Sequence, residues 1–169
     1  PTAGFSGAAT LTVTTNDLGN SGSGGPLSDT DTVNIQVATN VSIQDASLFE
    51  PQSGTANMIF TVTMSAPAPA GGASVSFTTV QLAPALNHAT AGQDYTTTSG
   101  TLNFAAGEQF KTINVTVLSD NKKNEANETF EVQLSNPVNL TIADGTAVGT
   151  IIETAAPGAV LISEIRTSG

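Results

Sequence analysis

The sequence lacks cysteine and tryptophan altogether, and its 169 residues include only one histidine, His88, and one tyrosine, Tyr95. Without cysteine the chain forms no disulfide, and one histidine alone cannot supply a typical zinc site. No acidic residue adjoins His88 in the sequence to build a nucleophile triad, and aromatic platforms for stacking sugars are nearly absent. We therefore expect a non-catalytic protein with His88 at a loop surface.

Basic residues are also scarce, with four Lys and Arg against 14 Asp and Glu, which gives a formal net charge of −10. Such an acidic surface repels phosphate backbones, so we expect no nucleic-acid partner. The apolar runs are far shorter than the roughly 20 residues of a membrane-spanning helix, so we expect no membrane insertion. The acids either keep a β-rich protein soluble or cluster to hold Ca²⁺, a hard cation that prefers oxygen ligands.

The chain opens at Pro1, with no initiator methionine and no basic, apolar secretion leader. This beginning predicts an interior piece of a longer polypeptide. The lack of cysteine fits a large bacterial secreted protein, but it also fits a reduced cytosolic protein.

Apolar residues alternate with Thr, Ser and Asn at period two, which is the pattern of strands with one buried face. The expected strands are 57–64, 73–82, 102–104, 109–118, 129–135 and 147–152. The side chains expected to point inward are Met58, Phe60, Val62, Met64, Val75, Phe77, Leu102, Phe104, Ile113, Val115, Val117, Phe130, Val132 and Leu134. Short strands, regular turns and no helical period predict an all-β fold, an antiparallel immunoglobulin-like β-sandwich of about seven strands with extra strands at both ends.

The extra strands stand outside this sandwich. Residues 1–38 contain two alternating runs, one around Leu11 and one from Val33 to Val37, with a loop rich in Gly and Ser between them. After a linker, residues 160–165 form another apolar run that needs cover. Since two strands alone are marginal in water, we expect partners in neighbouring domains of the same polypeptide or in identical copies. Exchange of strands between copies would build a head-to-tail fibre.

Three motifs resemble the Calx-beta repeat over about residues 41–154, namely A-T-A-G-Q-D-Y-T, S-G-T-L-N-F-A-A-G-E and N-E-T-F-E-V-Q-L-S-N-P. That repeat is found in sodium–calcium exchangers, integrin beta-four and large bacterial surface proteins. The first 38 residues resemble the last two strands of a bacterial cadherin-like or immunoglobulin-like repeat, and A-V-L-I-S-E-I resembles the first strand of a lamin-tail-like domain. The implied division is 1–38, 39–154 and 155–169.

In calcium-binding members of the family, acids from several loops meet at one end of the sandwich. Carried over to this sequence, the resemblance implies metal ligands at Glu50, Asp94, Asp120, Glu125, Glu128 and Glu153. Three departures weaken this implication: Ser119 replaces an aspartate, Lys122 and Lys123 add positive charge, and only Glu153 remains of the closing acidic run. The implied cofactor is therefore one weakly bound calcium ion, and a solvated acidic loop is the alternative.

The resemblance and the unpartnered strands together imply a non-catalytic structural or adhesion module of a large multidomain bacterial protein, at the cell surface or secreted. Two alternatives stay open at this point. One is a calcium-binding regulatory module, and the other is an accessory domain of a secreted enzyme such as an extracellular nuclease.

Overall fold

A computed structural model describes residues 7–18, 23, 27–83, 87–120, 122 and 126–153, and the regular elements in these ranges are all strands. No helix in this part of the chain is long and apolar enough to cross a membrane. The strands are β1 (Gly7–Asn16), β2 (Ser28–Val37), β3 (Asn40–Ile43), β4 (Ala46–Phe49), β5 (Thr55–Met64), β6 (Ala73–Val80), β7 (Ser99–Phe104), β8 (Phe110–Leu118), β9 (Glu128–Val138), β10 (Thr141–Asp144) and β11 (Thr146–Ile152).

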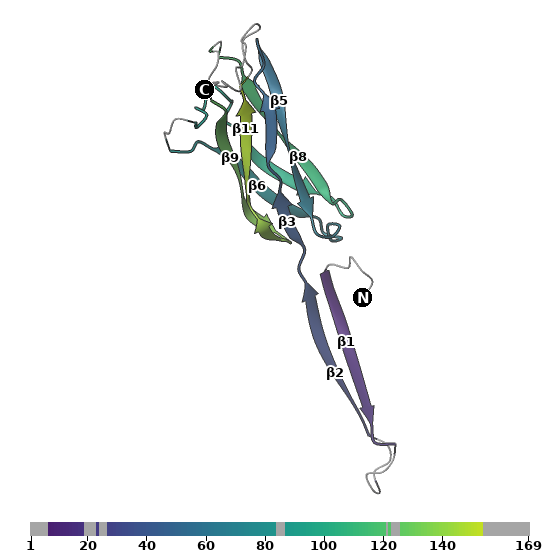
Figure 1. The fold of residues 1–169 in the computed structure, drawn as a ribbon. Coiled ribbons are helices and arrows are strands. Elements are labelled where there is room, and N and C mark those ends of the chain that lie inside the picture. The colour runs from purple at the N-terminus through teal and green to yellow at the C-terminus, as the bar shows by residue number, and fades with distance from the viewer. Residues whose placement is uncertain are drawn as a thin grey trace, which may run out of the picture.

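Nine of these strands form two facing sheets, a four-stranded sheet in the order β10-β3-β5-β8 and a five-stranded sheet in the order β4-β11-β9-β6-β7 (Figure 1). The first and last strands of the sandwich are each broken in two, as β3 with β4 and β10 with β11. Counting each broken pair as one strand leaves seven. The expected all-β, immunoglobulin-like sandwich is therefore confirmed.

The two breaks also explain why the sandwich is not purely antiparallel. Strand β3 pairs antiparallel with β5, and the chain then crosses at Gln44 and Asp45 so that β4 pairs parallel with β11 in the other sheet. Strand β10 likewise pairs parallel with β3. The Asp45 carboxylate accepts a hydrogen bond from the Val148 N–H at 2.7 Å, which fastens the crossing to β11. This corner joins the two sheets.

The core lies between the sheets and consists of the side chains that alternate inward. Thirteen of the fourteen expected inward residues are buried. Phe77 is only partly buried, because its ring lies over Gly100 of the edge strand β7. The centre is aromatic, since the Phe130 ring stacks on Tyr95 at 4.2 Å and meets Phe60 edge-on at 5.9 Å. Gly149 leaves room for this cluster, because a Cβ there would lie 2.6 Å from Phe130 Cζ.

Strands β1 and β2 form a separate two-stranded hairpin that projects from the end of the sandwich where β3 begins (Figure 1). The two runs therefore pair with each other, in a register that places Leu11 opposite Val33. Residues directly opposite in an antiparallel pair share a face, so Ala9, Leu11, Val13, Val33 and Ile35 lie on one side. Leu11 and Val33 are 52% and 53% exposed, so this apolar face is open.

Threonines and Asn34 line the opposite face of the hairpin, where the Thr10 hydroxyl donates to Asn34 Oδ1 at 3.3 Å. The assignment of residues 1–38 to a preceding repeat stays a prediction. The expected strand at 160–165 lies outside the described residues.

Candidate functional site

Asp94 closes a turn that attaches the segment before β7 to the open edge of β8. Its Oδ2 accepts a hydrogen bond from the Thr90 N–H at 2.6 Å, and Gly92 supplies a left-handed φ of +84° in the same turn. The Asp94 carbonyl accepts from the Leu118 N–H at 2.9 Å. Asp94 is 7% exposed. The Asp94 carboxylate therefore stabilises this turn.

The turn delivers Tyr95 into the core, where its side chain is fully buried. Its hydroxyl has no hydrogen-bond partner in the described part of the chain. Burial, followed by the nearby negative charge of Asp94, raises the pKa of the Tyr95 phenol. The ring thus works as a packing group that stacks on Phe130.

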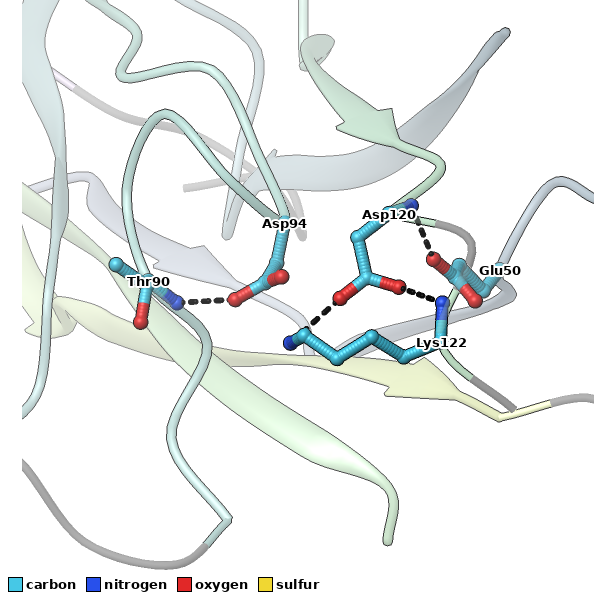
Figure 2. A network of polar contacts seen from close by, with 5 residues as sticks. All are labelled: Glu50, Thr90, Asp94, Asp120 and Lys122. Carbon is cyan, nitrogen blue, oxygen red and sulfur yellow. Dashed lines mark hydrogen bonds and ion pairs between the residues drawn. The ribbon is translucent and has the colours of Figure 1, made fainter. Parts of the chain in front are cut away.

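Asp120, just after β8, is the centre of a small polar network that Figure 2 shows. Its Oδ2 forms an ion pair with Lys122 Nζ at 2.6 Å, and its Oδ1 accepts from the Lys122 backbone N–H at 2.8 Å. The Asp120 N–H in turn donates to Glu50 Oε1 at 2.9 Å, across 70 residues of sequence. The structure therefore brings Glu50 and Asp120 together at one end of the sandwich.

The charge state of Asp120 follows from these contacts. Burial alone would raise the pKa of its carboxyl, but the side-chain and backbone donors of Lys122, and the lysine charge, outweigh burial and lower that pKa. The Asp120 side chain is 13% exposed and the Lys122 side chain is 52% exposed. An ionised Asp120 is thus the stable form of this network.

Two of the remaining predicted ligands, Glu128 and Glu153, lie within the described residues. Glu128 is the first residue of β9 and is partly exposed, and the Glu153 N–H donates to Asn127 Oδ1 at 3.1 Å. Glu125 lies outside the described residues. The partly exposed His88 contacts the Ala83 carbonyl through Nδ1, in keeping with its expected loop position.

These contacts test whether the described acids suit calcium, which takes about six to eight oxygen ligands. Within the described ranges, no group of three or more His, Cys, Asp or Glu side chains could hold a metal ion. Asp94 and Glu50 each bind a backbone N–H, and both oxygens of Asp120 contact Lys122. These three carboxylates therefore fit protein donors and an ammonium group better than a calcium ion.

Sequence reasoning noticed the positive charge of Lys122 but missed its role as the partner of Asp120. The available signal was the spacing, because the side chain of an aspartate often accepts a hydrogen bond from the backbone N–H two residues further along the chain. The same spacing lets the long lysine side chain fold back onto the carboxylate.

The architecture is that of an immunoglobulin-like sandwich whose first and last strands are each interrupted. A family model for the Calx-beta domain matches residues 34–155. The chain therefore belongs to the Calx-beta domain family, as the motifs predicted.

Solved structures support the same fold. The chain is similar to the apo form of the Calx CBD1 domain, with 20% identity, a TM-score of 0.55, and coverage of 69% of this chain and 98% of that one. It is also similar to the calcium binding domain CBD12 of CALX1.1, with 22% identity, a TM-score of 0.51, and coverage of 67% and 45%. It is similar to the Calx CBD2 domain as well, with 17% identity, a TM-score of 0.51, and coverage of 68% of this chain and 86% of that one. A comparison with curated proteins found no match.

Proposed function

We propose that this chain is a non-catalytic structural or adhesion module of a large bacterial protein, at the cell surface or secreted, that is joined to its neighbours through strand pairing. One observation carries the proposal: the hairpin of β1 and β2 is fully paired along its length, yet its apolar face is open. An isolated two-stranded hairpin is marginal in water, whereas a third strand or a covering layer makes such a face stable.

The apolar run at 160–165 is the strand that would pair with this hairpin. The length of chain between Ile152 and this run decides whether it can reach the hairpin of its own copy or only that of another copy. The Glu50 N–H binds the Ile152 carbonyl, so β11 ends at the sandwich end where Asp120 lies, and the hairpin joins the opposite end through β3. By strand lengths, the middle of the hairpin is about 50 Å from Ile152. The thirteen residues to Ile165 extend at most about 45 Å. A strand from an identical copy, arranged head to tail, therefore suits the hairpin better than the chain's own run.

Sedimentation velocity over a wide concentration range tests this assembly. We expect the unmodified chain to form species larger than a monomer, and we expect the Leu11→Thr, Val33→Thr double variant to stay monomeric because the centre of its hairpin face is polar. Ile59→Thr is the matched control, since Ile59 is an exposed apolar residue of the sandwich strand β5. A chain that is monomeric at every concentration would overturn assembly between copies.

Calcium-dependent regulation is a second candidate, favoured by membership of the Calx-beta family. It requires Asp120 to exchange its lysine partner for the ion. Calorimetric titration with millimolar Ca²⁺ tests it, and the absence of both heat and thermal shift would remove this candidate.

A further inference from the structure

The polar network at Asp120 fastens three strand ends that belong to both sheets. Asp120 follows β8 of the four-stranded sheet, and Glu50 follows β4 of the five-stranded sheet. The Asp120 N–H donates to Glu50 Oε1, while the Glu50 N–H donates to the Ile152 carbonyl of β11 at 2.9 Å. A positive group that pairs with the Asp120 carboxylate therefore helps to keep the ends of β8, β4 and β11 together.

Lys122 contacts both oxygens of the Asp120 carboxylate: its ammonium group neutralises the charge at Oδ2, and its backbone N–H donates a hydrogen bond to Oδ1 (Figure 2). A carboxylate with only 13% of its side chain exposed is costly to leave without a partner. The chain carries only four Lys and Arg residues against 14 acids, so such a pairing is not expected from abundance of cations.

We propose that the Lys122 ammonium is a counter-ion carried by the chain itself, which holds Asp120 in place and makes this end of the sandwich independent of a bound divalent cation. The ammonium contacts one oxygen of Asp120 and the Lys122 N–H contacts the other, so a metal that binds this carboxylate must compete with Lys122. Where folding prepares a metal site, binding energy adds to folding energy; here the lysine makes that contribution without the metal. The inference is independent of the hairpin and of assembly.

Thermal unfolding of three chains, each with EDTA and with millimolar CaCl₂, tests the proposal. The chains are the unmodified protein, Lys122→Met, which keeps the aliphatic stem, and Lys111→Met as the matched control. Lys111 forms an ion pair with Glu108 at 2.9 Å, at the opposite end of β8.

We expect the midpoint of the unmodified chain to be the same with EDTA and with calcium. We expect Lys122→Met to lower the midpoint in EDTA by about 2–4 °C, more than Lys111→Met does. The loss should disappear in the Asp120→Asn background, because the two residues act as a pair. Equal midpoints for Lys122→Met and the unmodified chain would overturn the proposal. So would a calcium-induced rise in the unmodified chain as large as the Lys122→Met loss.

Discussion

The hairpin of β1 and β2 and the strand pair of β5 and β8 have the same local pattern but different surroundings. Both are antiparallel pairs of long strands with apolar residues at every second position. Phe60 on β5 is completely buried under the facing sheet, whereas Leu11 on β1 is 52% exposed. Alternation therefore predicts that a strand has an apolar face, but a second layer decides whether that face contributes to stability.

The largest expected effect compares a truncation in the sandwich core with a truncation on the open hairpin face. Phe60→Ala removes a ring that packs against Phe130, so it should lower the free energy of unfolding by about 3–5 kcal/mol. Leu11→Ala on the open hairpin should change it by less than about 0.5 kcal/mol in the monomer. Urea unfolding of dilute protein measures both, and equal losses would contradict the distinction between the two regions.

Gly149→Ala tests how closely the sandwich core is packed. A Cβ at this position would lie 2.6 Å from Phe130 Cζ and 2.8 Å from Phe60 Cζ, so we expect a loss of about 1–3 kcal/mol. Gly71→Ala is the control, because a Cβ there meets no atom within 4 Å. If the two variants unfold at the same urea concentration, the aromatic cluster is looser than the distances indicate.

Asp120→Asn should cost up to about 1 kcal/mol at neutral pH, because it breaks the pair with the half-exposed Lys122. The folded-state pKa of Asp120 is lowered, so its contribution is present above the unfolded pKa of about 4 and is lost as the pH falls through the folded pKa. Acid titration of stability should therefore show a smaller decrease in Asp120→Asn. A variant with an unchanged acid profile would contradict this assignment.

Tyr95→Phe should have the smallest effect, between no change and a gain of about 1 kcal/mol, because the buried hydroxyl lacks a hydrogen-bond partner among the described residues. The folded-state pKa of the phenol is raised, so the unfolded chain ionises first and stability falls as the pH rises above about 10. The variant should lose part of that alkaline decrease. A clear loss of stability at neutral pH would show that the hydroxyl has a partner.

The regular part of the fold was predictable because residues such as Met58, Val115 and Val132 alternate without interruption. The short strands β4 and β10 were not, since four residues give no recognisable period and their pairing depends on distant strands. Strand β6 also ends at Val80, before the predicted position, while β9 continues to Val138.

The family resemblance named Glu50 and Asp120 as implied metal ligands, and in the structure each residue follows a strand at the same end of the sandwich. The resemblance could not show that the nearest cation is Lys122, because a side-chain conformation decides that contact. The functions of Asp94 in a turn and of Tyr95 in the core were likewise visible only in three dimensions.

The central claim is that the sandwich is complete by itself and the hairpin needs a partner. Amide hydrogen exchange, resolved by residue in a verified monomer and again in concentrated protein, tests it most directly. The account predicts strong protection throughout β5 and β8 in both samples, and protection of β1 and β2 only in the concentrated one. Amides of β1 and β2 that exchange as slowly as those of β5 in the monomer would contradict it.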